Sequence, residues 1–556
     1  MKKINSFLVL LYLSFIGISA QNQVTDPLKS KLIPSKYNRN ALTVVVLDNN
    51  GSHISEIKNA SGQITIPEKF DDNNLSVRIL PGESDKDMIL KSINNFKLSN
   101  QILAKSFART PSGEFDMTFV GKRGMYNATA DDMKKASASK KGLDNIREAG
   151  KSLVNNSYIQ VLDIRKVISM EEYYNNLDAI NLSNSKIYGT QFKPVSRTQN
   201  GWKGEVVSYL YKIDANAIDT LYDKMWIYDD DSNETKTMKR DLFDNSKFRF
   251  DFVMAVTAEA NGTQYNPGQF LAPKVQLTED ELFVKLTQSA LENSLFALDS
   301  KYEPFRVKTS VYAINPVQSK IGTKEGLYIN QRFFVLENEQ NSKGEIIAKR
   351  KAVVRVNKIT NNSQISTTND LKMSSFYQTA GNIIQTGMTM QQRNDNGLGI
   401  SLGSTLIGGM GGITAKVEKS SSLSPQLKVF LAGAIDAKDY GGDSYAFLRY
   451  QLGISKGFYF ARNFSFAPFA AYGMETSPID ETVSINTSFL NIGTYATFNL
   501  LHNCQLVGTA NYYLLMGNAI ASDSETNETL NLGIKYDDLF DGRSGLALEL
   551  SLRIEL

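Results

Sequence analysis

The sequence predicts a multidomain chain with two unlike parts, a mixed α/β (α+β) soluble region followed by an antiparallel β-barrel of about eight strands. Three observations support this division. Between residues 41 and 359, segments with the apolar spacing of helices alternate with β-branched, strand-like segments. Residues 360–375 are rich in Ser, Thr and Asn, and helical spacing disappears after about residue 395. From there to residue 556, strand-length segments of alternating polarity follow one another, separated by turn residues.

The N-terminus matches the pattern of a secretory signal peptide over residues 1–20. Lys2 and Lys3 give a positive start, and residues 7–18 form an apolar stretch that is short for a bilayer span. Small residues then precede a cleavage point at Gln21. We therefore expect an exported protein.

The composition argues against several classes of function. The formal net charge is +3, of which the leader supplies two charges, so a nucleic-acid partner is not expected. Cys504 is the single cysteine and can form no internal disulfide, and the spacing of a zinc site is missing. His53 and His502 are the only histidines. We expect neither a metal nor another cofactor, and the sequence offers no catalytic residues.

The α/β region shows both helical and strand-like segments, which we expect to form one or two domains. Thr278 and Glu281 form a capping box at the start of one helix. The expected strands are 41–47, 158–164, 202–213, 224–228, 248–258 and 305–313, the expected helices are 84–107, 142–154 and 278–297, and a hairpin is expected from 327–336 and 346–359. We expect residues 360–395 to be a linker.

The last segment of the chain shows the clearest strand pattern. Aliphatic side chains occupy every second position and mostly polar or charged side chains stand between them, so one face of the strand is wholly aliphatic. Four earlier segments repeat the pattern, at 427–436, 448–455, 505–514 and 529–536. The residues expected on the outward face are Leu448, Tyr450, Leu452, Ile454, Leu530, Leu532, Ile534, Leu546, Leu548, Leu550, Leu552, Ile554 and Leu556. Those expected on the inward face are Arg449, Lys535, Glu549, Arg553 and Glu555.

These segments suit a membrane barrel. They are roughly ten residues long, the length of a tilted transmembrane strand. Only helices and closed barrels satisfy every backbone group in lipid, and no apolar run after the leader is long enough for a spanning helix. Aromatic residues gather near segment ends, as at Phe458 and Phe464. An even strand count is usual, so we expect eight strands, a lumen filled by side chains, and mutual pairing of the inward charges.

Residues 396–556 resemble the small outer-membrane β-barrels of the OmpA/OmpX type. The resemblance rests on the alternating segments, and it implies short turns on the periplasmic side and longer loops outside. Leu556 departs from the family, whose members usually end in an aromatic residue. A soluble β-sandwich is the structural alternative, because its strands alternate as well.

Two short motifs have simple structural interpretations. Gly397, Gly399 and Gly403 spell GxGxxxG, but they alternate with apolar residues in a strand-like segment, so we expect tight barrel packing rather than a nucleotide site. Asp229 and Asp231 resemble the start of a calcium loop that lacks its glycine and its final glutamate. We expect a solvated acidic turn there.

The hypothesis that follows is a non-enzymatic outer-membrane anchor. The barrel, residues 396–556, would contact outer-membrane lipid, and residues 21–359 would lie in the periplasm and bind or scaffold another envelope component, such as cell wall or a partner protein. One alternative is a membrane-tethered periplasmic enzyme with converging carboxylates in residues 41–360. Another is a soluble secreted binding protein with a C-terminal sandwich.

Overall fold

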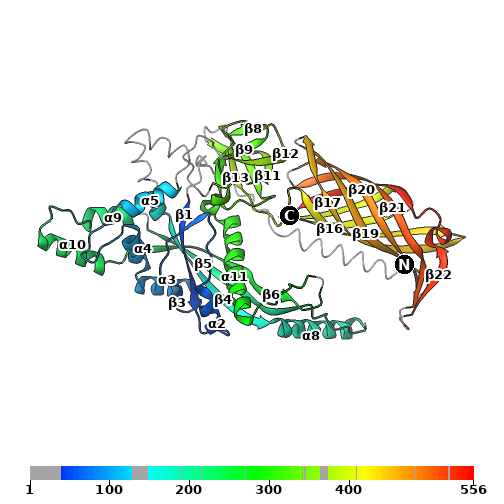
Figure 1. The fold of residues 1–556 in the computed structure, drawn as a ribbon, viewed down its shortest axis with the longest axis horizontal. Coiled ribbons are helices and arrows are strands. Elements are labelled where there is room, and N and C mark those ends of the chain that lie inside the picture. Colours follow the sequence, from blue (N-terminus) through cyan, green and yellow to red (C-terminus); the bar gives the residue numbers. More distant parts are fainter. Residues whose placement is uncertain are drawn as a thin grey trace.

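The computed structural model describes residues 39–556 except 128–147, 149, 190, 215, 270, 341, 343–345, 363–372, 409, 462, 481, 502, 524, 525 and 527. The predicted signal peptide therefore lies outside the described residues. The described chain forms a six-stranded, a seven-stranded and a ten-stranded sheet. They succeed one another along the chain as an α/β unit (residues 40–301), a sheet unit (residues 308–395) and a barrel (residues 398–555) (Figure 1).

The α/β unit is built on a mixed sheet in the order β2-β1-β4-β5-β6, with β3 also paired to β1. Its first strand, β1 (Asn40–Asp48), is the predicted β-branched run and is parallel to β2, β3 and β4. Every residue of β1 before Asp48 is buried, because helices cover both faces of the sheet. The other strands are β2 (Phe70–Asp72), β3 (Ile79–Pro81), β4 (Ser157–Ser169), β5 (Gln199–Ile213) and β6 (Phe250–Tyr265).

Two groups of helices enclose this sheet. On one face, α2 (Ile54–Ser61) and α11 (Glu279–Lys301) share a core with Leu42, Val44 and Val46. The predicted capping box begins α11 and is confirmed. The other face is covered by α3 (Lys86–Asn95), α4 (Leu98–Ser106), α5 (Thr118–Asn127), α9 (Ala217–Lys224) and α10 (Asn233–Asn245). A further helix, α8 (Met170–Tyr188), extends beyond the sheet (Figure 1). Among the described residues, no helix is both long and apolar enough to cross a membrane.

Two expected elements of the α/β unit are wrong. The single helix over 84–107 is two helices, since Lys97 between α3 and α4 has a φ of 48°, which breaks the helical path. The expected strand at 224–228 is absent, because Trp226 packs against the rings of Phe115 and Tyr222 on the helical side of the core. The expected helix at 142–154 lies largely outside the described residues.

The sheet unit contradicts the expected linker at 360–395. Two strands in that range join its sheet, which has the antiparallel order β7-β13-β10-β11-β12-β9-β8. Phe376 and Met390 are buried with Phe333 in its core, so the unit extends to residue 395. The strands are β7 (Lys308–Ser310), β8 (Ala313–Ile314), β9 (Val317–Ser319), β10 (Arg332–Gln340), β11 (Ile346–Lys358), β12 (Ser374–Gly381) and β13 (Thr389–Gln392). The predicted hairpin is confirmed as β10–β11, although β10 begins later than expected.

The C-terminal part is a closed antiparallel barrel of eight strands, as predicted. The ring closes through pairing of β14 with β23 and of β17 with β19. Its strands are β14 (Leu398–Ile407), β15 (Ile413–Ser420), β16 (Leu427–Tyr440), β17 (Asp443–Lys456), β19 (Phe464–Pro478), β20 (Val483–Asn499), β21 (Cys504–Asp523) and β23 (Gly545–Glu555). Two further strands, β18 (Phe458–Ala461) and β22 (Thr529–Lys535), pair with the ring on one side only.

Both short motifs have structural roles. A Cβ at Gly403 would lie 2.4 Å from the carbonyl oxygen of Leu550, so the GxGxxxG run marks close strand packing in β14. Ser232 accepts a hydrogen bond from the backbone N–H of Thr235 and caps α10, while Asp231 pairs with Lys239 at 2.7 Å. The calcium-like sequence is therefore the start of a helix.

The contact of β6 with α11 gives a test of the α/β unit. A Cβ at Gly262 would lie 2.1 Å from the carbonyl oxygen of Leu282, and backbone cannot yield as a flexible side chain does. We expect Gly262→Ala to destabilise this unit by about 2 kcal/mol or more. Urea unfolding followed by tryptophan fluorescence measures the effect, because the two tryptophans of the chain, Trp202 and Trp226, both lie in this unit.

Gly62→Ala is the matched control, because a Cβ there meets nothing within 4 Å and the backbone is helical. Equal unfolding midpoints for the two variants would contradict the proposed packing of α11 on β6.

Candidate functional site in the barrel and at its junction

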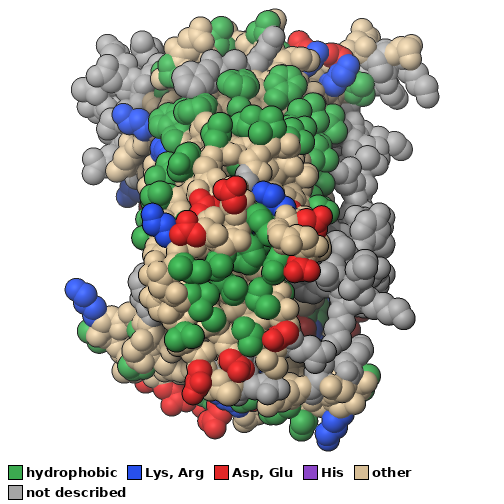
Figure 2. Space-filling model, turned by 90° about the vertical axis from the view of Figure 1, so that its right-hand side faces the viewer, with side chains coloured by type: hydrophobic (Ala, Val, Ile, Leu, Met, Phe, Trp, Pro, Cys, Tyr) green, Lys and Arg blue, Asp and Glu red, His purple; other side chains and the backbone are tan. Residues whose placement is uncertain are grey.

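The outer wall of the barrel is apolar. The ten predicted outward residues of β17 and of the final segment, 546–556, are between 36% and 61% exposed. Large exposed apolar side chains also stand on the other strands of the ring, among them Leu402, Val417, Leu431, Tyr472, Ile492 and Leu514. Figure 2 shows the barrel end of the molecule, where hydrophobic side chains cover wide areas and charged side chains form smaller groups. An apolar surface of this extent is unusual for a water-soluble monomer.

Four of the predicted wall and lumen residues lie elsewhere. Leu530, Leu532, Ile534 and Lys535 belong to β22, which pairs with β21 beyond the closed ring. Leu530 and Ile534 are exposed, and Lys535 is exposed rather than inside the lumen. Their alternation predicted a strand correctly, but the chain turns into the short helix α12 (Tyr536–Leu539) instead of entering the ring.

A cluster of charges fills the half of the lumen nearest the sheet unit. The Glu418 carboxylate, 2% exposed, accepts from Lys428 Nζ at 2.5 Å and from Arg553 Nη1 at 2.9 Å. Lys416 Nζ lies 3.4 Å from the same carboxylate and 3.7 Å from the ring centre of Tyr495. Three cations thus surround one buried anion. Arg553 is one of the predicted lumen residues, whereas Glu418, Lys416 and Lys428 were not predicted. The signal that could have found them is the alternation of polar side chains along β15 and β16.

A second cluster occupies the opposite end of the barrel. Arg543 is fully buried and makes a two-point contact with Glu475, at 2.9 Å from Nε and 2.5 Å from Nη2. Its Nη1 lies 2.7 Å from Asp436, and its guanidinium lies 3.9 Å from the ring centre of Phe447. Arg449, one of the predicted lumen residues, approaches the same Glu475 at 3.9 Å. Paired in this way, buried charges avoid the large cost of an isolated ion.

Arg543 comes from the connection between β22 and β23, which folds over this end of the barrel. Tyr536 and Phe540 of that connection are buried against Phe447 and Ala519 of the ring. The connection therefore closes the barrel with an aromatic core and an ion pair.

Polar side chains fill the space between the two clusters. Asn491 donates to Gln451 at 2.8 Å and accepts from Asn511 at 2.9 Å. The predicted lumen residue Glu549 accepts from the hydroxyl of Tyr513 at 3.0 Å. Two cavities among the described lumen residues measure about 40 and 30 Å³, room for a few water molecules at most. Among the described residues, side chains therefore pack the lumen closely around these two cavities.

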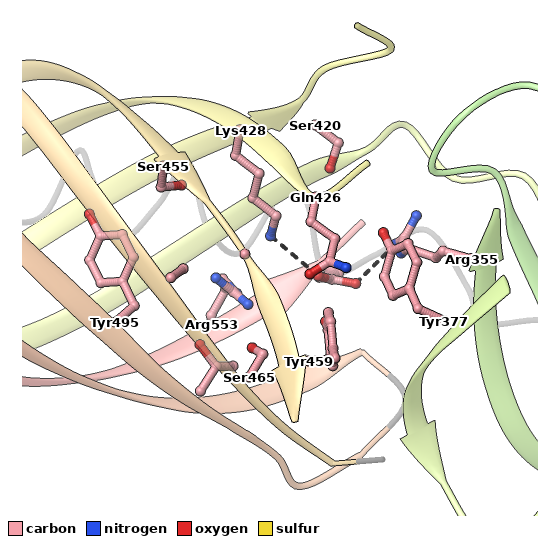
Figure 3. A pocket seen from close by; sticks show the side chains of 14 residues that line it. Arg355, Tyr377, Ser420, Gln426, Lys428, Ser455, Tyr459, Ser465, Tyr495 and Arg553 are labelled. Carbon is pink, nitrogen blue, oxygen red and sulfur yellow. Dashed lines mark hydrogen bonds and ion pairs between the residues drawn. The ribbon is translucent and has the colours of Figure 1, made fainter. Parts of the chain in front are cut away.

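The sheet unit is joined to the lumen by a buried arginine. Arg355 of β11 contacts Asp395 at 2.5 Å and Glu555, the last residue of β23, at 3.0 Å. Burial alone would lower the pKa of Arg355, but Glu555 and Asp395 hold it well above its usual value. Glu555 also lies 3.6 Å from Lys428. The charge cluster of the lumen therefore continues into the sheet unit, as the dashed lines of Figure 3 show.

Asn330 fixes the same junction through its amide. Its Nδ2 donates to the carbonyl of Ser421 at 2.7 Å, and its Oδ1 accepts from the backbone N–H of Gln426 at 2.9 Å and from the hydroxyl of Tyr377 at 2.8 Å. The turn between β15 and β16 is thereby held from both sides. Tyr377 also faces Tyr459 of the barrel, with 5.2 Å between ring centres. The sheet unit covers this end of the barrel.

The other side of the sheet unit is tied to the α/β unit. Lys69 and Asp299 form a buried ion pair within the α/β unit. Asn394 donates to the Asp299 carboxylate at 3.3 Å, and Gln392 donates to it at 3.5 Å. The sheet unit thus bridges the barrel and the α/β unit through polar contacts.

Comparisons with known proteins add little to this geometry. No family model and no curated protein matches the chain. Among solved structures, the chain is similar to a major outer membrane protein from Thermus thermophilus, with 16% identity, a TM-score of 0.22, and coverage of 29% of this chain and 99% of that one. It is similar to the outer membrane protease OmpT from Escherichia coli, with 7% identity, a TM-score of 0.14, and coverage of 41% and 94%.

A third similar structure is an anion-selective porin from Comamonas acidovorans, with 9% identity, a TM-score of 0.10, and coverage of 64% of this chain and 89% of that one. Similarities this low carry no argument about what this chain does. The described residues hold no cluster of three or more His, Cys, Asp or Glu that would suit a metal ion. What the fold and its site define is a closed β-barrel with a packed, ion-paired lumen.

The junction predicts the effect of removing its arginine. Arg355→Ala removes the cation that Asp395 and Glu555 share, while Arg332 remains 3.4 Å from Asp395 and Lys428 remains 3.6 Å from Glu555. Because each carboxylate keeps one cation, we expect a loss below the roughly 3–5 kcal/mol of a fully broken buried pair. We expect the sheet unit to loosen from the barrel, and backbone amides of residues 421–426 to exchange hydrogen for deuterium faster. Mass spectrometry of the exchanged peptides measures this.

Arg350→Ala is the control, because Arg350 lies on the same strand but is exposed and takes no part in the junction. Unchanged exchange at residues 421–426 in Arg355→Ala, or an equal increase in the control, would contradict the role of Arg355.

Proposed function

We propose that this protein is an outer-membrane β-barrel protein whose barrel serves as a pore-less anchor for its α/β and sheet units in the periplasm. The observation that carries the proposal is the apolar outer wall of the closed ring. A soluble sandwich would bury the leucines of β23 against a second sheet, whereas here they point away from the ring.

The energetics favour lipid around this wall. Removing one large aliphatic side chain from water is worth about 1.5–3 kcal/mol. The exposed side chains of the eight strands would lose this stabilisation in water and would regain it in hydrocarbon. The inward faces, which carry paired charges such as Glu418 with Arg553, remain shielded from lipid.

The orientation follows from how the chain enters and leaves the ring. Asn396 and Leu556 lie at the same end, joined by a backbone hydrogen bond of 3.2 Å, and the sheet unit sits there. The longest connection of the ring, between β21 and β23, lies at the opposite end. Longer connections of outer-membrane barrels face outside, which supports a periplasmic sheet unit and α/β unit.

The packed lumen supports an anchor rather than a conduit. The sheet unit covers one end, and the connection that carries Arg543 covers the other. A barrel with a packed lumen and two covered ends is suited to holding the sheet unit and the α/β unit at the membrane. We infer that these units bind or scaffold another envelope component there without catalysing a reaction.

A substitution on the wall tests the proposal. Leu550→Arg places a charge at the middle of β23, which costs about 2–4 kcal/mol if the position faces the centre of a bilayer. We expect the wild-type protein in the detergent-extracted membrane fraction, with a band on an SDS gel that shifts when the sample is boiled. Leu550→Arg should reduce the fraction of this heat-modifiable form.

Leu530→Arg is the matched control, because Leu530 is 65% exposed but lies on β22 outside the ring. We expect it to leave the heat-modifiable fraction unchanged. In a water-soluble protein both substitutions would be equally harmless, so equal behaviour, or recovery of the protein without detergent, would refute the proposal.

A further inference from the structure

A broad, open hollow lies at the edge of the α/β unit, far in the sequence from the barrel. It is formed between the connection of β2 to β3 and the helix α4, and its volume is about 640 Å³. The polar and charged residues of its lining are Asn74, Ser76, Arg78, Gln101, Lys105 and Arg109. The hollow therefore has a polar floor with room for a ligand of several heavy atoms.

All charged side chains of this lining are positive: it has three cations and no carboxylate. Arg78 lies 3.6 Å from Asp72 and Arg109 lies 2.9 Å from Asp244, both outside the lining. Lys105 donates to the neutral backbone carbonyl of Asn74, which leaves its positive charge without a formal counter-charge in that contact. The hollow consequently favours an anion.

Several arginine donors at the hollow lack acceptors among the described residues. Nη1 of Arg78, and Nε and Nη2 of Arg109, are buried and make no hydrogen bond there. These donors are covered by protein atoms, so they leave the guanidinium charge only partly compensated by hydrogen bonds. The parts of the side chains open to a ligand are 26% of Arg78 and 16% of Arg109. The planar guanidinium suits the two oxygens of a carboxylate or phosphate.

Arg109 is also held in place before any ligand arrives. Its guanidinium lies 4.4 Å from the ring centre of Phe243 and 5.8 Å from that of Phe115. A fixed side chain loses little conformational entropy on binding, which favours recognition by this arginine.

The hollow faces away from the membrane in the proposed orientation. Figure 1 places α4 on the side of the α/β unit that is distant from the barrel. A ligand there would come from the periplasm or the cell wall rather than from the outer membrane.

We propose that this hollow binds an oxyanionic ligand with at least two carboxylate or phosphate groups, and that it is where the α/β unit engages an envelope component bearing such groups. The chemistry of the ligand follows from the hollow alone, whereas its source in the periplasm or cell wall rests on the proposed function.

The test is isothermal titration of the full chain in detergent micelles with citrate and with pyrophosphate as separate probes. We expect saturable binding of at least one probe. Arg78→Gln and Lys105→Gln should each weaken it about tenfold or more, because each removes a charged hydrogen-bond donor. Lys91→Gln, on the exposed face of α3, is the control for charge and should bind as the wild type does.

Tryptophan fluorescence on unfolding in urea confirms that each variant remains folded. Saturation by neither probe, or an equal loss in Lys91→Gln, would overturn the inference. Binding to anionic lipid vesicles is measured as well. If the wild type binds the vesicles and Arg78→Gln does not, the ligand is a lipid headgroup, and the assignment to a periplasmic or cell-wall ligand is wrong. If the protein is heat-modifiable but binds neither probe, only this inference is refuted. If it is recovered without detergent and binds a probe, only the membrane proposal is refuted.

Discussion

The pairing of charges inside the barrel is the interaction on which the rest of the structure depends. A strand that turns an aliphatic face outward must turn its other face inward, and in β15 and β23 that face carries Lys416, Glu418, Arg553 and Glu555. An isolated ion in this space would be expensive. Glu418 accordingly has three cations within 3.4 Å, and Glu555 has two within 3.6 Å. This pairing lets a narrow ring keep a charged interior and an apolar wall.

The same network determines how the sheet unit and the α/β unit attach to the barrel. Glu555 belongs both to the lumen cluster, through Lys428, and to the junction, through Arg355. The sheet unit is therefore docked by charges that the barrel already buries, and its opposite side shares the Asp299 carboxylate with the α/β unit. The three units are therefore linked by buried polar contacts.

The sequence predicted those parts of the molecule that depend on local patterns. Such patterns depend on a few neighbouring residues only. They are the alternation in β17 and β23, the β-branched run of β1 and the capping box of α11. Features set by distant pairing could not be found in this way. The strand of Lys535 alternates like a ring strand, yet among the described strands it pairs with β21 alone. The short strands of residues 374–392 join their sheet by pairing with β10 and β11. Arg78 and Arg109 line one hollow although 30 residues of chain separate them, because α4 lies beside the connection of β2 to β3.

Contact between the wall of the ring and hydrocarbon can be measured with spin labels along β23. Single nitroxide labels at positions 546 to 555 of the protein in lipid bilayers would be scanned for collision with oxygen, which dissolves in hydrocarbon, and with a water-soluble nickel complex. We expect high oxygen accessibility at the even positions and low accessibility to both reagents at the odd positions near the middle of the strand. Even positions that collide mainly with the nickel complex would contradict this contact.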